Sequence, residues 1–196
     1  MTIPIPEDSP EEEATRSGYV TLVGRPNAGK STLMNALLGE RLSIVTPKAQ
    51  TTWQRVTGIL TTDRAQMVFL DTPGLLDPRD LLQHAMLAAA LEALAEADVV
   101  LLVLDGPRAF GPKGLDRMVD SLADRPPVPL LVAINKMDLM ETEHLDGVSR
   151  WVSQELGGEP FTVCARDGIG RRANFASASG GLGKTRQDLF RCRCAA

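Results

Sequence analysis

Eight residues near the start of the chain have the types and spacing needed to hold phosphate groups. Gly24-Arg-Pro-Asn-Ala-Gly29-Lys30-Ser31 fits the pattern GxxxxGK[ST] and directly follows residues 19–23, a β-branched run typical of a strand. Glycines let the backbone close around phosphate oxygens. Lys30 would bring a positive charge to the β- and γ-phosphates, and the Ser31 hydroxyl can bind magnesium. The pattern predicts a nucleotide phosphate site; the alternative is an ordinary glycine-rich turn between a strand and a helix.

A second candidate, Asp71-Thr-Pro-Gly74, directly follows the apolar run 67–70. A carboxylate at that strand end can reach magnesium through a water molecule. The N–H of Gly74 can bind a γ-phosphate and move when that phosphate leaves. Taken alone, these four residues are also a common turn. Their place at a strand end, downstream of the phosphate motif, favours a magnesium site.

A third motif, Asn135-Lys136-Met137-Asp138, follows the apolar run 130–134 and has side chains suited to guanine. The Asp138 carboxylate can accept hydrogen bonds from the N1–H and the amino group of guanine, a pair of donors that adenine lacks. Asn135 can brace the loop, and the stem of Lys136 can lie across the base. The alternative is that Asp138 caps the next helix.

Two weaker signals complete the set of candidates. A backbone amide of Cys164-Ala165, after the last apolar run, can meet the guanine oxygen, although Cys164 is equally suited to be a small buried residue. A threonine hydroxyl in the loop 48–52 can join the magnesium shell when GTP is bound and leave afterwards. A polar loop without that role is the alternative.

The elements that must position these residues alternate between strands and helices. Apolar runs predict strands at 19–23, 58–60, 67–70, 99–104, 128–134 and 161–164, and periodic or Leu/Ala-rich stretches predict helices at 31–38, 81–97, 114–122 and 143–156. This alternation predicts an α/β fold with a mostly parallel central sheet of about six strands. Ligands of such sheets bind beyond the carboxyl ends of the strands, which is where the motifs fall.

Composition narrows the class of protein. The 196 residues include 43% hydrophobic and 23% charged residues with a net charge of −4, typical of one globular domain and not of a general nucleic-acid or membrane binder. Acidic residues interrupt the apolar region 85–104, so we expect no transmembrane segment. The acidic start is unlike a targeting segment, and three cysteines, Cys164, Cys192 and Cys194, favour a reducing compartment. We expect a cytoplasmic protein.

With these residues in view, the chain resembles the Era-like family of translation-associated P-loop GTPases over roughly residues 18–170. The resemblance rests on the order and spacing of 24–31, 50–52, 71–74 and 135–138. It implies a three-layer P-loop NTPase sandwich that hydrolyses GTP to GDP and phosphate with Mg²⁺. It also implies a role in small-ribosomal-subunit assembly, 16S-type rRNA or the small subunit as partner, and a monomer that is cytoplasmic or peripheral at the inner membrane.

Carried over residue by residue, the resemblance implies a site in four parts. The phosphates would be held by Asn27, Ala28, Gly29, Lys30, Ser31 and Thr32. Magnesium would be held by Ser31, by Thr52 with Thr51 as the less favoured alternative, and by Asp71 through water. Guanine would be bound by Asn135, Lys136 and Asp138, with backbone contacts from Cys164 and Ala165. Catalysis would depend on Asn27, Lys30, Thr52 and Gly74, with a potassium ion on Asn27 acting like an arginine finger.

The sequence also departs from its relatives. Cys164 stands where the family usually has serine, and Leu75 stands where Ras-like GTPases place the glutamine that orients water, as is usual in the Era group. We therefore expect catalysis by positioning and electrostatics. A guanine-nucleotide-binding module without turnover is the alternative.

The two ends of the chain differ from the middle. We expect residues 1–17 to be a disordered acidic leader and residues 18–170 to be the G domain. Full-length Era-like proteins continue into a KH-type RNA-binding domain, but we find no GXXG-bearing αβ unit after Gly170. We expect residues 171–196 to be a basic tail, either frameshifted and disordered or an arm that binds RNA.

Overall fold

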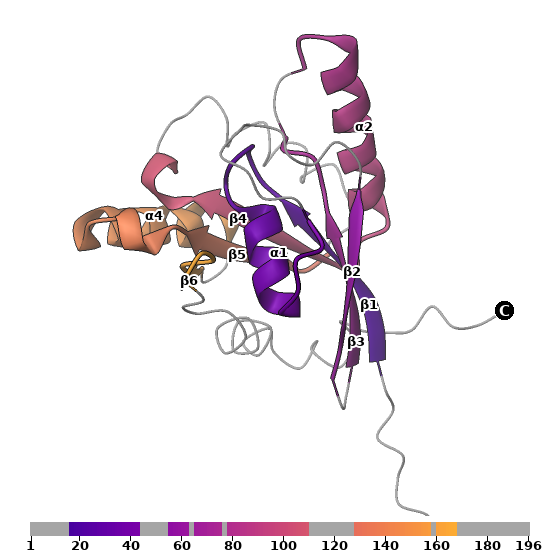
Figure 1. Ribbon diagram of the computed structural model, residues 1–196. Helices are drawn as coiled ribbons and strands as arrows, with labels where there is room; N and C mark the ends of the chain where they lie inside the picture. The colour runs from indigo at the N-terminus through magenta and orange to yellow at the C-terminus, as the bar shows by residue number, and fades with distance from the viewer. Residues whose placement is uncertain are drawn as a thin grey trace, which may run out of the picture.

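The computed structural model describes residues 16–43, 55–62, 65–75, 78–109, 128–157 and 160–167. These residues contain a six-stranded sheet in the order β2-β3-β1-β4-β5-β6 (Figure 1). Its strands are β1 (Arg16–Val23), β2 (Val56–Thr61), β3 (Ala65–Asp71), β4 (Val99–Asp105), β5 (Leu130–Asn135) and β6 (Phe161–Val163). Only the β2–β3 pair is antiparallel among the described pairings. The expected α/β class with a mostly parallel sheet is confirmed.

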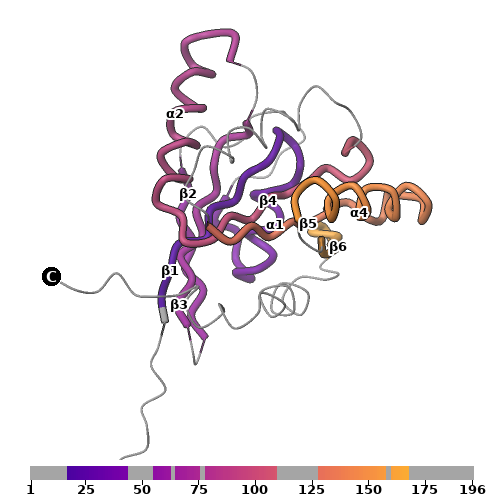
Figure 2. Tube along the Cα trace, turned by 180° about the vertical axis from the view of Figure 1, so that it is seen from behind, coloured from indigo at the N-terminus to yellow at the C-terminus, as the bar shows by residue number. Residues whose placement is uncertain are grey.

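Three helices are described beside the sheet: α1 (Lys30–Leu38), α2 (Leu81–Ala95) and α4 (Thr142–Leu156). Two short 3₁₀ turns, η1 (Gly106–Arg108) and η2 (Met137–Leu139), follow the ends of β4 and β5. Figure 2 shows the fold from behind, with α2 and α4 on the side of the sheet opposite α1. The three layers of a P-loop NTPase are thus present.

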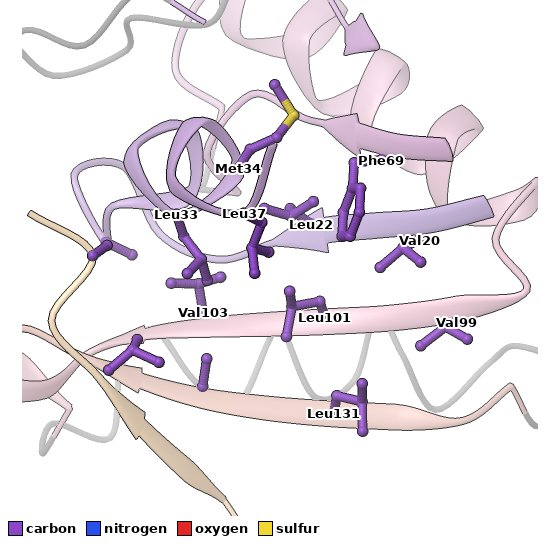
Figure 3. Packing of buried hydrophobic residues seen from close by; sticks show 14 residues of the cluster. Val20, Leu22, Leu33, Met34, Leu37, Phe69, Val99, Leu101, Val103 and Leu131 are labelled. Carbon is purple, nitrogen blue, oxygen red and sulfur yellow. The ribbon is translucent and has the colours of Figure 1, made fainter. Parts of the chain in front are cut away.

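Strand β4 shows why helices must cover both faces of the sheet. All seven of its residues are buried, and the six apolar ones, residues 99–104, alternate between two separate apolar clusters. Leu101 and Val103 belong to the cluster that contains Leu33 and Leu37 of α1, as Figure 3 shows. Residues 100, 102 and 104 belong to the cluster that contains residues of α2 and α4. A continuous apolar strand of this kind is typical of a parallel sheet covered on both faces.

The boundaries differ slightly from those expected. Strand β1 begins at Arg16, two residues before the expected start of the domain at Gly18, because Arg16 and Ser17 continue the parallel pairing with β3. Strand β5 begins at Leu130 and not at Val128, since Pro129 has no N–H to donate to a neighbouring strand. The carbonyl of Pro129 still accepts from the N–H of Val100, at 2.9 Å.

Several expectations lie outside the described residues: the leader up to residue 15, the loop 48–52, the helix 114–122 and the tail 171–196. Among the described helices, none is both long and apolar enough to cross a membrane.

Candidate nucleotide-binding site

The phosphate motif forms the loop between β1 and α1. Three of its residues have positive φ: Gly24, at 154°, Asn27, at 63°, and Gly29, at 95°. A side chain at Gly29 would be strained by that φ and would also collide with the amide of Asn135. The motif therefore requires glycine at this position, and the loop lies directly against the end of β5.

The ammonium of Lys30 is buried inside this loop. Only 6% of the residue is exposed, and Nζ donates to the carbonyls of Gly24 and Arg25, each at 3.2 Å. Burial lowers the pKa of Lys30 to about 8, although the nearby Asp71 carboxylate acts in the opposite direction. A positive charge held in a dry loop can interact strongly with phosphate oxygens.

Ser31 and Asp71 meet at the carboxyl ends of β1 and β3. The Ser31 hydroxyl donates to Oδ2 of Asp71 at 2.6 Å, and Asp71 is fully buried. A hydroxyl and a carboxylate oxygen are the kinds of ligand that magnesium prefers. This pair fits the expected metal site; the third expected ligand, Thr52, lies outside the described residues.

The residues after Asp71 pack directly against the phosphate loop. The hydroxyl of Thr72 donates to the carbonyl of Leu22 at 2.7 Å, and the N–H of Leu75 donates to the carbonyl of Gly24 at 3.1 Å. A side chain at Gly74 would collide with Pro26. Sequence reasoning identified Gly74 but missed Thr72 and the Leu75 amide, whose contacts depend on how two strand ends face each other.

Asn135 joins the phosphate loop to the candidate guanine loop. Its side-chain amide donates to the carbonyl of Ala28 at 2.8 Å and accepts from the N–H of Ala165 at 3.1 Å. Only 2% of Asn135 is exposed. The expected bracing role therefore has a physical basis, and the Ala165 amide, expected at the guanine oxygen, is bonded to Asn135.

The carboxylate of Asp138 has two side-chain donors. The thiol of Cys164 donates to Oδ1 at 3.0 Å, and Arg166 Nη2 donates to Oδ2 at 3.4 Å. The Cys164 thiol also lies 3.2 Å from Oδ2 of Asp167, and the Arg166 Nε donates to Oδ1 of Asp167 at 2.9 Å. Sequence reasoning expected only a backbone contact from Cys164 and missed Arg166 and Asp167.

The environment of Cys164 keeps its thiol protonated at neutral pH. Burial, followed by the hydrogen bond to Asp138, raises the pKa of the thiol to about 11. One Cys and two Asp lie close enough to share a metal ion, with candidate ligand atoms within 4.8 Å of one another. With its thiol protonated, Cys164 donates to the carboxylates of both aspartates, so the cluster is a hydrogen-bonded support for Asp138.

One acidic residue that no motif contains also takes part. Asp105, at the end of β4, is 2.9 Å from Nζ of Lys136. Sequence reasoning missed it; the available signal was an acidic residue directly after a continuous apolar run.

The geometry thus brings together residues at or just beyond the ends of five strands that run parallel in the sheet: β1, β3, β4, β5 and β6. The family described as 50S ribosome-binding GTPase matches residues 19–136, more than half of the chain. The chain belongs to this GTPase family.

Similar proteins support the assignment. GTPase Era of Leuconostoc citreum is 40% identical over 159 residues, which are 80% of this chain and 52% of the relative. GTPase Era of Dinoroseobacter shibae is 42% identical, over 80% of this chain and 51% of its own length. The chain thus spans about half the length of these curated relatives. The resemblance to Era-like GTPases is confirmed.

Solved structures give the same picture. A crystal structure of Era with MgGDPNP and nucleotides 1506–1542 of 16S ribosomal RNA has a TM-score of 0.78 and 34% identity, covering 84% of this chain and 56% of that one. The G domain of FeoB from Methanococcus jannaschii, at 22% identity and a TM-score of 0.61, shares the fold.

Proposed function

We propose that the chain binds guanine nucleotides with Mg²⁺ and hydrolyses GTP to GDP and phosphate. The observation that carries this proposal is the side chain of Asn135, which bonds to Ala28 in the phosphate loop and to Ala165 beside the guanine loop. A ligand with phosphates at one end and a base at the other requires two subsites at a fixed separation, and this amide links them.

On the phosphate side, we assign the backbone of residues 27–32 and the ammonium of Lys30 to the phosphates. Ser31 and Asp71 would hold the magnesium ion, with Thr52 as a further ligand, and the ion when bound neutralises phosphate charge. The amide of Gly74 would face the γ-phosphate. Lys30 must exchange its two carbonyl partners for phosphate oxygens, which are stronger acceptors because they are charged.

On the base side, Asp138 would accept the N1–H and amino group of guanine. Cys164 can stay in place while this happens because a carboxylate oxygen accepts more than one hydrogen bond. Arg166 is 74% exposed in its side chain and can move away into solvent. Lys136 would lie along the base.

Hydrolysis would proceed without a side-chain base at the position after Gly74. Leu75 is 9% exposed and has no proton to exchange. The rate would come from positioning of water and from positive charge at the transferring phosphate, supplied by Lys30 and by a potassium ion at Asn27. The exposed position of Asn27, in a loop at φ 63°, is compatible with an ion reaching it from solvent.

Binding is tested by calorimetry with GTP, GDP and xanthosine diphosphate on the parent chain and on Asp138→Asn. We expect micromolar binding of GDP by the parent chain and a preference for xanthosine diphosphate in the variant. Xanthine has an oxygen where guanine has its amino group, so the amide introduced by this substitution matches it. A parent chain that binds no guanine nucleotide would refute the proposal.

Turnover is tested by phosphate release at saturating GTP. A rate above that of uncatalysed GTP hydrolysis would show that the chain is a hydrolase and not a module that only binds nucleotide. Repeating the assay in sodium instead of potassium tests the role of Asn27, and an unchanged rate would rule that role out.

We also propose small-subunit ribosomal RNA as the partner, because the Era structure at 34% identity contains a 16S rRNA fragment. Binding should weaken steeply with salt if phosphate contacts dominate. Retention of an RNA of 16S nucleotides 1506–1542 in a mobility-shift assay would support this proposal. Equal retention of an unrelated RNA would contradict it. A cytoplasmic location and contact with the inner membrane stay predictions.

A further inference from the structure

Strand β4 ends in a carboxylate that none of the nucleotide motifs includes. Asp105 is the last residue of β4 and is 9% exposed. A buried carboxylate is costly unless a positive or hydrogen-bonding group compensates it. The compensating group is the ammonium of Lys136, with Nζ 2.9 Å from Oδ2 and the two side chains 30% and 8% exposed, respectively. The buried carboxylate therefore fixes where this long side chain goes.

The sheet register explains how the two residues meet. Asp105 pairs with Asn135 across the parallel β4–β5 ladder, so Lys136 is the first residue beyond that pair. Lys136 leaves the strand in the left-handed conformation, with φ 63° and ψ 37°. Such a conformation costs about 1 kcal/mol or more for a residue other than glycine. The ion pair and the bond from Leu139 N–H to the Lys136 carbonyl, at 3.0 Å, hold this turn in place.

The backbone after Asp105 is packed tightly beneath the same loop. A side chain at Gly106 would collide with the carbonyl of Asn135 and with the sulfur of Met140. The ring nitrogen Nε2 of His144 lies 3.1 Å from the Gly106 carbonyl, which ties this corner to α4. The backbone next to Asp105 is thus held in place by this packing and by its contact with α4.

We propose that Asp105 is a positioning residue for guanine binding. By holding the ammonium of Lys136, it fixes the aliphatic stem of that side chain where the base lies, without touching the nucleotide itself. The proposal rests on the guanine-nucleotide binding proposed above. It predicts that Asp105 affects the base end of the ligand and leaves the phosphate end unchanged.

The test is a double-mutant cycle on Asp105→Asn, Lys136→Met and the double variant, with GDP and GTP affinities measured by calorimetry. We expect Asp105→Asn to weaken both nucleotides by the same factor, about tenfold. KM for GTP should rise accordingly, with kcat within twofold of the parent. In the Lys136→Met background, Asp105→Asn should have no further effect on affinity, because the group through which it acts is gone.

The matched control is Glu96→Gln, which removes a carboxylate from another ion pair, Glu96 with Arg55 at 2.6 Å, outside the candidate site. This variant should keep the parent's affinities. A second variant, Asp105→Glu, keeps the charge but displaces it by one methylene, and it should give an intermediate affinity with unchanged kcat. If Asp105→Asn does not fold, the nucleotide affinity of Asp105→Glu tests the proposal in its place.

The outcomes separate the two proposals. If the parent binds no guanine nucleotide, the proposed function and this inference both fail. If the parent binds GDP but neither Asp105 variant weakens it, only the inference fails. An equal loss of affinity in the presence and absence of Lys136 would also overturn it, since Asp105 would then act on the fold in general and not through Lys136.

Discussion

The phosphate side and the guanine side of the site are held together in different ways. Lys30, Ser31 and Asp71 are all less than 10% exposed, and Lys30 bonds to main-chain carbonyls of its own loop. On the guanine side, Asp138 is supported by side chains from another segment, one of them the exposed Arg166. The phosphate half is thus built largely within one motif, and the guanine half is assembled from the ends of β4, β5 and β6.

This difference explains why the two halves should respond differently to substitution. A buried ammonium costs folding free energy, and under the proposed function Lys30 offsets that cost only when it binds phosphates. The side chains around Asp138 stabilise one another, so a change there affects both local structure and the base. The comparison can be tested at both ends of the site.

The largest effect is expected for Lys30→Met, which replaces the buried ammonium by an apolar side chain of similar length. GTP affinity should fall by on the order of 100-fold or more, because charge-assisted hydrogen bonds to phosphate are lost. The melting temperature without nucleotide should stay equal or rise, since burial already lowers the pKa of this ammonium. Calorimetry and thermal melting give the two values.

Lys136→Met is the matched control, because it makes the same change on the guanine side. This variant should bind GTP about tenfold more weakly, a smaller loss than for Lys30→Met, because the side chain of Lys136 is 30% exposed and its charge is more strongly screened by solvent. Equal losses of GTP affinity in Lys30→Met and Lys136→Met would contradict the proposed difference between the phosphate half and the guanine half.

The next effect concerns the chemistry of Cys164. Because its pKa rises from 9.0 to about 11, its thiolate fraction below pH 9 is about 100-fold lower than that of an ordinary thiol, and alkylation should be slower by at least that factor. Iodoacetamide labelling followed by peptide mass spectrometry measures the rate in folded and urea-unfolded protein. Equal rates in the two states would contradict a protonated thiol beneath Asp138.

The raised pKa of Cys164 also predicts how the stability of the fold changes with pH. The folded state binds the thiol proton more tightly than the unfolded state. The stabilisation from this group is therefore complete below pH 9 and is lost as pH rises from 9 towards 11. The hydroxyl of Cys164→Ser does not titrate in this range. The free energy of unfolding of this variant, measured in urea, should therefore fall less between pH 9 and pH 11 than that of the parent.

A smaller effect is expected for Gly29→Ala, which tests the link between the two halves. Positive φ alone costs an alanine about 1 kcal/mol. Gly157 has a φ of 70° with open space where a side chain would go, whereas a side chain at Gly29 would collide with Asn135. Gly157→Ala should therefore lower the free energy of unfolding by about 1 kcal/mol. Gly29→Ala should lower it by about 2 kcal/mol, because the collision with Asn135 adds to the cost of positive φ.

Nucleotide affinity separates these two glycine variants further. Gly29→Ala should weaken GDP about tenfold, because displacing Asn135 disturbs both subsites. Gly157→Ala should leave GDP affinity unchanged. Equal unfolding free energies for the two variants would show that the contact with Asn135 is unimportant.

The smallest effect is expected for Arg166→Ala. Its pair with Asp138 is long, at 3.4 Å, and its side chain is 74% exposed. GDP affinity should change by about threefold or less. A larger loss in calorimetry would mean that the guanine half depends on this arginine, and the division between buried and exposed support would need revision.

These contrasts also show what could be predicted from the sequence. The strands, the phosphate loop and the pair of Ser31 with Asp71 follow from local patterns, because each motif directly follows an apolar run. Asp105 and Arg166 did not follow, because their partners, Lys136 and Asp138, come after the end of another strand, and their positions depend on sheet order and register. The thiol bond of Cys164 required knowing that β6 ends beside η2.

The place of β1 in the sheet has a consequence for the order in which the molecule is completed. It is the first described strand in the chain yet lies between β3 and β4, and Tyr19 bonds with Asp98, 79 residues later. The bond from Asn135 to Ala28 spans 107 residues. During synthesis, the phosphate loop leaves the ribosome early but cannot gain this bond until most of the domain has followed. Because the site depends on such long-range contacts, it cannot be complete until Asn135 and Ala165 have been made, although its first residues are made early.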